Sequence, residues 1–475
     1  MIPHTVEQVL TITKGKLIQG NGNNVLYDAA YRFERLTQKN TVLFLRMQRS
    51  IDWKRLLEFT PLTFVTNNIF PELQAFQDCP IIQVNNIDLA YWSFVDYYRN
   101  LFDIPFIAVT GTCGKTSTKE LIKHILEQDR KVQATRGSAN SRLQDLPYLL
   151  GIDKTTKAAV IETAVGRPGD LAEHCRYFKP SIGIITNIGV YHLDECKTVE
   201  AYINAKAEML DGLDNKGTLI LNADDENTKT IKLESFKGKI VYIGLNTTAD
   251  YLASQIEFAQ NGMKFILNYR GKKYPVFVPG YGEHQVYNAL TAIAAVHEVG
   301  VEIEEATKRL RSYKNFPRYM EVFTGIKGST LIDDTFLTNP TSIKAALKLL
   351  DSLARGKKKI AVLGEVNRLG EHKVKYHQII GEMVAENSVD VLFTIGRTAA
   401  EIGRAAIRKG YRGQVESFET MAGVHHKLTT IIDEKSIVLV KGYAYDKAMV
   451  ALAQKLKAGY TTCVSDLMMP TKMLE

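Results

Sequence analysis

The sequence has few cysteines and no long apolar run. Its 475 residues include five isolated cysteines, none in a CxxC pair: Cys79, Cys113, Cys175, Cys196 and Cys463. We therefore expect free thiols in a reducing compartment, and neither a disulfide framework nor a cysteine zinc site. No apolar stretch approaches the ~20 residues that cross a bilayer, and the first residues lack a charged start followed by an apolar core. The sequence thus predicts a cytoplasmic protein without a membrane partner.

Proline, glycine and charge of one sign are also modest. With 13 prolines, 33 glycines and 45% hydrophobic residues, the chain is neither low-complexity nor disordered. The net charge is only +8, and the densest basic run, Lys357-Lys358-Lys359, directly precedes an apolar strand pattern. Because no basic stripe is interleaved with aromatic residues, a nucleic-acid partner is disfavoured, including for an NTPase that acts on nucleic acid. A mild positive charge suits an anionic small-molecule substrate instead.

Short apolar runs alternate with helical patterns, which is typical of parallel strands covered by helices in an α/β fold. The expected strands are Ile104–Val109, Ala158–Ile161, Ile182–Thr186, Ile360–Leu363, Val389–Ile395 and Ile437–Val440. Shorter ones precede them at Val42–Leu45, Leu62–Val65 and Ile81–Val84. We also expect Pro317 to end a helix that carries Ala306–Tyr313. The pattern predicts three domains: a small α/β domain over 1–102, a central doubly wound domain over 103–316, and an α/β domain over 317–475.

The most specific motif follows the strand at 104–109. It reads Gly111-Thr112-Cys113-Gly114-Lys115-Thr116 and leads into a helix with Leu121, Ile122, Ile125 and Leu126 on one face. Glycines let backbone N–H groups surround a phosphate at a helix N-terminus, while the lysine supplies charge and the threonine hydroxyl can hold Mg²⁺. The ordinary G-x-x-x-x-G-K-[ST] spacing is not met, because position 109 is Val. Strand, loop and helix together still favour a nucleotide phosphate site over a simple tight turn.

Three further polar residues follow strands or lie on a helix downstream. Glu162 ends the apolar run AAVIE, His192 follows a strand that ends in Thr186, and Lys206 lies on a helical stretch between two alanines. Glu162 could reach the same Mg²⁺, because the carboxyl ends of parallel strands meet at one edge of the sheet. Taken singly, the histidine is explained by a satisfied structural role and the lysine by a solvated helix face.

Their joint order resembles the Mur ligase family, the ATP-dependent amide ligases of peptidoglycan precursor assembly and their folate-polyglutamylating relatives. The likeness also includes Gly282-x-His284-x3-Asn288 and spans about residues 104–450. It implies that the phosphate loop and the following residue bind ATP and that Asn288 contacts adenine. It further implies a metal site, in which a carbamylated lysine acts as a carboxylate-like Mg²⁺ ligand. The implied ATP residues are Gly111, Thr112, Gly114, Lys115, Thr116, Ser117 and Asn288; the implied metal and catalytic residues are Lys115, Thr116, Glu162, His192 and Lys206.

The last third of the chain extends the resemblance. FPRYMEVF and TLIDDTFLTNP are similar to the family's arginine and its DD…NP segment, which implies that Arg318 and Asp333 reach ATP from the third domain, with Asp334 and Asn339 close by. Without that likeness, the two aspartates and Asn-Pro would be read as a turn and a helix cap. Arg318 and Asp333 would arrive when the third domain closes on ATP.

The substrate pair is suggested by IAVLGEVNRLGEHKVKYHQIIG and IVLVKG, which look most like family members that add D-alanyl-D-alanine to a UDP-N-acetylmuramoyl tripeptide. Several recognition motifs differ. The amino-terminal domain lacks the expected Asp-Ser-Arg and Asp-Gly-His, Asp145 stands where a glycine is expected, and Tyr443 stands where a serine is expected. A ligase that joins an amino acid or peptide to a non-UDP carboxylate is therefore the alternative. A catalytically silent relative is disfavoured because Lys115, Glu162, His192 and Lys206 are all present. We expect a monomer.

Overall fold

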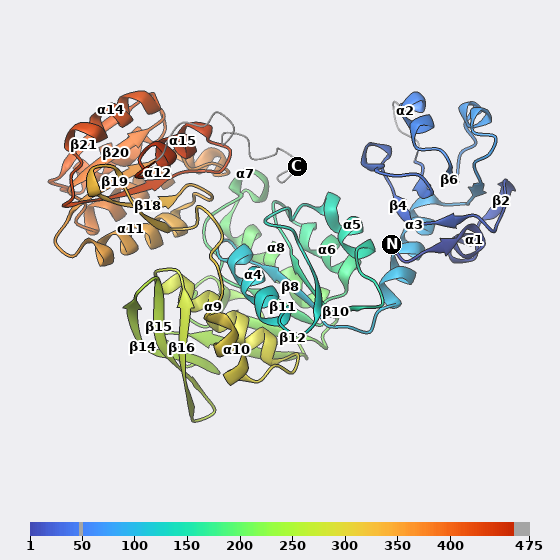
Figure 1. Cartoon of the computed structure of the whole chain (residues 1–475), viewed down its shortest axis with the longest axis horizontal. Helices are drawn as coiled ribbons and strands as arrows, with labels where there is room; N and C mark the ends of the chain where they lie inside the picture. The colour runs from blue at the N-terminus through green and yellow to red at the C-terminus, as the bar shows by residue number, and fades with distance from the viewer. Residues whose placement is uncertain (47–50, 460–475) are drawn as a thin grey trace.

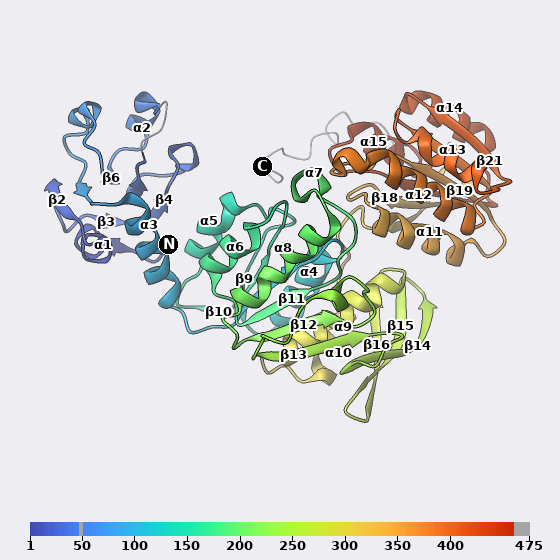
Figure 2. The ribbon, with the colours of Figure 1, turned by 180° about the vertical axis from the view of Figure 1, so that it is seen from behind.

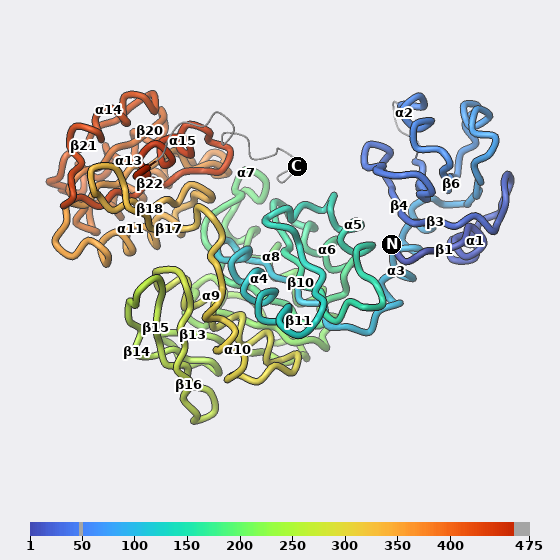
Figure 3. Tube along the Cα trace, viewed as in Figure 1, coloured from blue at the N-terminus to red at the C-terminus, as the bar shows by residue number. Residues whose placement is uncertain are grey.

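The computed structural model describes residues 1–46 and 51–459. Three lobes follow one another in chain order, with the central lobe between the other two (Figures 1 and 3). The amino-terminal lobe contains a five-stranded sheet of order β2-β7-β6-β5-β4, in which only β2 pairs antiparallel. Its elements are β1 (His4–Thr5), α1 (Val6–Thr13), β2 (Lys16–Gln19), β3 (Val25–Leu26), β4 (Asp28–Ala30), β5 (Thr41–Phe44), α2 (Trp53–Glu58), β6 (Leu62–Thr66), β7 (Ile81–Gln83) and α3 (Ile87–Asn100).

The central lobe is built on a nine-stranded sheet of order β16-β15-β14-β13-β12-β11-β8-β10-β9. The strands from β9 to β14 pair parallel, and β15 and β16 extend the sheet antiparallel as a projecting hairpin (Figure 1). Its strands are β8 (Phe106–Thr110), β9 (Lys131–Ala134), β10 (Thr156–Glu162), β11 (Ile182–Ile185), β12 (Thr218–Asn222), β13 (Lys239–Gly244), β14 (Tyr251–Ala259), β15 (Gly262–Tyr269) and β16 (Lys272–Pro279). Its helices are α4 (Lys115–Leu126), α5 (Asp145–Leu150), α6 (Asp170–Phe178), α7 (Leu193–Cys196), α8 (Val199–Gly212), α9 (Glu283–His297) and α10 (Ile303–Leu310).

Strand order places the phosphate loop at a switch point of the central sheet. β8 lies between β10 and β11 and is parallel to both, so the chain leaves β8 toward one neighbour and later returns on the other side. Such a reversal opens a crevice beyond the carboxyl ends of the strands, where ligands bind in open α/β sheets. Helices α4 and α9 cover one face of the sheet with apolar side chains, and α6 and α8 cover the other (Figure 2).

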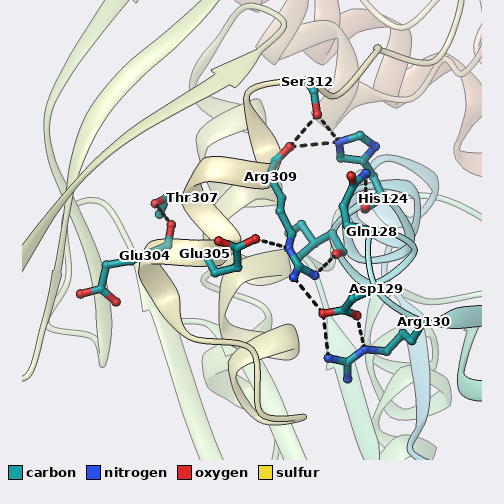
Figure 4. A network of polar contacts seen from close by, with 10 residues as sticks. His124, Gln128, Asp129, Arg130, Glu304, Glu305, Thr307, Arg309 and Ser312 are labelled. Atoms are coloured by element: carbon teal, nitrogen blue, oxygen red, sulfur yellow. Dashed lines mark hydrogen bonds and ion pairs between the residues drawn. The ribbon is translucent and has the colours of Figure 1, made fainter.

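A polar network fixes α10 to the carboxyl end of α4 (Figure 4). The Arg309 guanidinium donates to the Ile125 carbonyl at 2.8 Å, to Asp129 at 2.8 Å and to Glu305 at 2.7 Å. His124 Nε2 lies 3.0 Å from the Arg309 carbonyl oxygen. The helix that carries the phosphate loop and the segment that leads into the third lobe are therefore held together at one point.

The third lobe has a six-stranded sheet of order β17-β18-β22-β19-β20-β21, in which only β17 is antiparallel. It contacts the central lobe beside α7, where the Leu193 N–H donates to the Arg368 carbonyl at 2.8 Å and the Arg368 guanidinium pairs with Asp194 at 3.0 Å. Its elements are β17 (Glu321–Thr324), β18 (Thr330–Asp334), α11 (Pro340–Ala354), β19 (Lys358–Leu363), α12 (Lys373–Glu386), β20 (Val391–Ile395), α13 (Ala400–Arg408), β21 (Gln414–Phe418), α14 (Met421–Ile431), β22 (Ser436–Lys441) and α15 (Lys447–Lys455).

The α/β fold class and the nine strands expected from the sequence are confirmed, each within a few residues of its expected bounds. One helix end is wrong: α10 stops at Leu310, well before Pro317, because His124 binds the Arg309 carbonyl and the Ser312 hydroxyl where the chain leaves the helix. Within residues 1–46 and 51–459, no helix is long and apolar enough to cross a membrane, and four cysteines are free thiols. Cys463 lies outside the described residues.

Candidate active site

The phosphate loop is a tight turn between β8 and α4. Gly111 has φ +142°, and a Cβ at this position would lie 1.9 Å from Thr186 Oγ1. Gly114 has φ +81°, and a Cβ there would lie 2.5 Å from Asn288 Oδ1. Both positions therefore require glycine, because a left-handed backbone and close neighbours exclude larger residues. Lys115 opens α4 and donates from Nζ to the Thr112 carbonyl at 3.2 Å, so a cation lies at the helix N-terminus, where anions bind.

Glu162 lies beside the start of α4, as its position at the end of β10 predicts. The Thr116 hydroxyl donates to Glu162 Oε2 at 2.9 Å, and Asn140 Nδ2 donates to Oε1 at 2.6 Å. The backbone N–H of Glu162 is also fixed, because it donates to Thr135 Oγ1 at 2.9 Å. Side chains from two separate segments thus orient both oxygens of this carboxylate, which is 98% buried.

His192 and Lys206 meet on the other side of the phosphate loop, around the ring of Tyr202. Lys206 Nζ lies 4.5 Å from the Tyr202 ring centroid and donates to the Gly111 carbonyl at 3.1 Å, and the His192 ring centroid lies 6.1 Å from that of Tyr202. Burial, and then the nearby Lys115, hold the pKa of Lys206 well below its ordinary value. Burial, followed by the charges of Lys206 and Lys115, lowers the pKa of His192 to about 3. His192 is therefore a neutral imidazole at physiological pH.

The side chains beside the phosphate loop fit a magnesium ion, except that one oxygen ligand is missing. Thr116 and Glu162 offer the hydroxyl and carboxylate oxygens that Mg²⁺ prefers, and the buried His192 Nδ1 has no hydrogen-bond partner among the described residues. No group of three or more His, Cys, Asp or Glu side chains that could hold a metal ion occurs in residues 1–46 and 51–459. The uncharged form of a lysine amine reacts with CO₂ to give a carbamate, which at Lys206 would supply the missing oxygen ligand.

A cavity of about 480 Å³ adjoins the phosphate loop and lies between the central and third lobes. Gly114, Ser117 and Asn288 line its central-lobe wall. The family resemblance implies that these residues bind ATP, and that role stays a prediction. Asp334 and Lys441 line the opposite wall and form a buried ion pair of 2.7 Å at the carboxyl ends of two strands. A ligand in this cavity would touch both lobes at once.

Arg318 and Asp333 do not line this cavity in the structure. Asp333 points to the other side of β18, where it accepts from the Thr335 hydroxyl at 2.7 Å and pairs with Lys457 at 3.1 Å. Its neighbour Asp334 faces the cavity, because successive side chains of a strand alternate between faces. Arg318 is buried against the Phe336 ring, 5.6 Å from its centroid. Their roles toward ATP stay predictions.

Several residues at the cavity were not identified from the sequence. Tyr319 comes from the segment that enters the third lobe, and its side chain hydrogen-bonds to Thr116. Asp224 follows β12 and binds the Leu245 and Thr247 N–H groups at 2.6 and 2.7 Å, together with the Tyr287 hydroxyl at 2.9 Å. The run Asn222-Ala-Asp-Asp directly after an apolar segment is the signal that could have identified this turn.

Family comparisons match two of the three lobes. The Mur ligase middle domain matches residues 109–296, and the Mur ligase, glutamate ligase domain matches residues 319–444. The UDP-N-acetylmuramoyl-tripeptide--D-alanyl-D-alanine ligase of Bacillus subtilis (strain 168) is 29% identical over 341 residues, which cover 71% of this chain and 73% of that protein.

Solved structures share the whole fold. MurF from Acinetobacter baumannii matches with a TM-score of 0.82 and 24% identity, over 95% of this chain and 99% of that chain. MurF ligase from Thermotoga maritima, in complex with ADP, matches with a TM-score of 0.76 and 19% identity, over 90% of this chain and 97% of that chain. At these identities the likeness concerns the fold. Taken with the two family matches and the geometry around the phosphate loop, it shows that this chain belongs to the Mur ligase family of ATP-dependent, C–N bond-forming ligases.

Proposed function

We propose that this protein joins the amine of D-alanyl-D-alanine to the terminal carboxylate of a UDP-N-acetylmuramoyl tripeptide, at the expense of ATP. The observation that carries the reaction type is the arrangement of Thr116 and Glu162 at one side of the phosphate loop, with Lys115 at the helix start and Lys206 behind the loop. The substrate pair rests on the related enzymes, which carry this activity in their names.

The chemistry follows from the low reactivity of a carboxylate toward an amine. A carboxylate oxygen first attacks the γ-phosphorus of ATP, and the bond from that phosphorus to the bridging oxygen breaks to release ADP. The product is an acyl phosphate. The amine nitrogen then attacks the acyl carbon, the tetrahedral intermediate expels phosphate, and the nitrogen loses a proton to leave the amide.

Lys115 and the backbone N–H groups of the loop would bind the phosphates and offset charge that moves to the bridging oxygen. Lys441 and Asp334 would meet the nucleotide from the third lobe, so that the reacting groups are enclosed when both lobes bind it. Enclosure matters because water would otherwise hydrolyse the acyl phosphate.

We also propose that the reaction requires bound Mg²⁺. Thr116, Glu162, His192 and a carbamylated Lys206 would hold one or two such ions, which would neutralise phosphate charge during transfer. In carbamate formation the nitrogen of the Lys206 amine bonds to the carbon of CO₂, and one proton is released. The neutral state of His192 leaves a ring nitrogen able to bind a metal.

The acceptor would lie along the amino-terminal lobe, which contacts α6 of the central lobe. A second cavity, of about 500 Å³, opens between these lobes, and Arg176 of α6 stacks over the Trp92 ring at 3.6 Å from its centroid. Ala29 and Ala30 of β4 lie in the stretch where the Asp-Ser-Arg motif is expected, and both are buried in the sheet. We therefore propose that this chain holds its acceptor with a different set of side chains from its relatives. The free thiols fit a reducing, cytoplasmic setting.

The test offers purified protein, ATP and Mg²⁺ with paired panels of amines and carboxylates, and measures phosphate release together with product mass. Phosphate release that requires both UDP-N-acetylmuramoyl tripeptide and D-alanyl-D-alanine supports the proposal. Turnover with another carboxylate, and none with this pair, would replace the acceptor while keeping the ligase chemistry. The Lys115→Ala variant, which removes the phosphate-loop cation, is the matched control for ATP-dependent release.

A further inference from the structure

The loop between β9 and α5 folds over Glu162 and is tied down at its start. Lys119, fully buried in α4, donates to the Thr135 carbonyl at 2.7 Å and to the Gly137 carbonyl at 2.9 Å. Tyr148 accepts from the Arg136 N–H at 3.1 Å and donates to the Ala139 carbonyl at 3.0 Å. Asn140, which hydrogen-bonds to Glu162, comes next.

The end of the same loop is fastened to α6. Arg142 reaches across to Asp170 at 3.1 Å and to Glu173 at 2.5 Å. Asp145 Oδ1 and His174 Nδ1 lie 2.8 Å apart, and both side chains are at least 98% buried. We call these five residues the α5–α6 clasp. Helices α5 and α6 lie side by side between the amino-terminal lobe and the central sheet (Figures 1 and 2).

The buried pair is costly as a packing device. Asp145 Oδ2 and His174 Nε2 are buried without a hydrogen-bond partner among the described residues. An apolar pair of similar volume would avoid that loss, because an unsatisfied buried polar atom is destabilising. Asp145 also stands where the family resemblance leads one to expect a glycine. Because the Asp145–His174 pair lowers the stability of the fold in this way, its role is better explained by the need to hold the loop in place than by stability.

The start of α6 connects the clasp to the other side of the site. Asp170 Oδ2 accepts from the Gly166 and Arg167 N–H groups, each at 2.9 Å. A Cβ on Gly166 would lie 3.7 Å from His192 Nδ1, so this turn passes directly beside the histidine. The clasp therefore joins the loop that carries Asn140 to the turn beside His192.

We propose that Asp145 and His174, with Arg142, are positioning residues that hold Asn140 against Glu162 and so set the carboxylate for magnesium. They act through Asn140, and none of the three lines the cavity between the central and third lobes. The proposal rests on the proposed function only in assigning magnesium to Glu162, and the identity of the acceptor does not enter it.

The experiment measures binding rather than turnover. The full-length protein is titrated calorimetrically with AMP-PNP, a non-hydrolysable ATP analogue, with and without Mg²⁺. We expect Asp145→Leu to raise the Kd measured with Mg²⁺ at least tenfold and to leave the Kd measured without Mg²⁺ within twofold. Because Asp145→Leu can fail to fold, Arg142→Met at the partly exposed end of the clasp provides a second variant, with an expected rise of at least threefold.

Rescue and control variants separate positioning from general stability. Asp145→Asn and His174→Asn keep a hydrogen-bonding atom at the contact, so both should bind Mg²⁺ and AMP-PNP within threefold of the parent protein. Tyr91→Phe removes another buried polar contact to α6, the 2.5 Å hydroxyl pair with Tyr177, and should lower the melting temperature without changing nucleotide binding.

Three results would overturn the proposal: normal magnesium-dependent binding in Arg142→Met, an equal loss in Tyr91→Phe, or parent affinity that does not depend on Mg²⁺. Failure of the proposed function gives a different result. In that case the parent protein binds AMP-PNP with Mg²⁺ as expected but forms no amide from UDP-N-acetylmuramoyl tripeptide.

Discussion

Replacing Asn140 by alanine gives the sharpest test of how the carboxylate is held. The change removes the 2.6 Å hydrogen bond to Glu162 Oε1 and leaves the 2.9 Å bond from Thr116 to the other oxygen. A hydrogen bond to a charged group contributes about 1.5–3 kcal/mol. Since each ~1.4 kcal/mol is a factor of ten in rate, kcat/KM for ATP with Mg²⁺ should fall roughly 10- to 150-fold. Phosphate release measured over a range of Mg²⁺ concentrations reports both the loss and any shift of the magnesium requirement.

Ser141→Ala is the matched control, because the neighbouring serine is exposed and its side chain makes no capping bond. It should leave kcat/KM unchanged. A loss of less than threefold in Asn140→Ala, with a folded protein, would refute the view that this amide orients Glu162. An equal loss in both variants would attribute the effect to the loop as a whole.

Other variants test the remaining parts of the site and of the scaffold. Lys115→Ala should reduce ATP-dependent phosphate release by about 10²- to 10³-fold, since the variant loses a charge beside the transferring group; unchanged turnover would exclude the loop as the phosphoryl site. Lys206→Ala should nearly abolish amide formation in a mass assay, and Lys206→Glu should restore part of it by supplying a carboxylate; full activity of the alanine variant would remove the carbamate role. Arg309→Met should lower the free energy of urea unfolding by about 1–2 kcal/mol, from the lost bonds to the Ile125 carbonyl and Asp129. Arg130 and Arg309 hold the pKa of Asp129 at about 2, so this carboxylate stabilises the fold above its unfolded pKa of ~3.9, and that contribution should disappear as pH falls toward 2. The difference in free energy of unfolding between Arg309→Met and the parent protein should therefore shrink over this pH range, and a constant difference would contradict the assignment.

Strong apolar runs explain why the parallel strands could be predicted from sequence. Those at Phe106–Thr110 and Ser436–Lys441 are buried on both faces, so their composition alone indicates strands. The antiparallel extension at Gly262–Pro279 was not predicted, because polar and apolar residues mix along its two strands. The domain limits at residues 102 and 316 stay predictions.

The candidate site could be predicted from sequence where a motif is specific to one kind of chemistry, as a glycine loop followed by a lysine is to phosphate binding. The glycine loop, Lys115 and Glu162 are near one another because strand order brings their strands side by side. Tyr319 was not predicted, because its place at the cavity depends on how the third lobe packs against the central lobe. Asp334 was expected only close to the site, with Asp333 reaching into it, whereas Asp334 is the one that lines the cavity. A single sequence does not state which of two adjacent aspartates faces a cavity until the strand register is known.

The thiol of Cys113 provides an intrinsic reporter of lobe separation. Its Sγ lies 3.3 Å from Asn339 Nδ2, which caps the first helix after β18 in the third lobe, and burial raises its pKa. The other described cysteines are buried within single lobes. Cys113 is only partly buried and lines the cavity between the lobes, so a maleimide reagent should modify it faster when the two lobes part, and a nucleotide that bridges the lobes should slow the labelling.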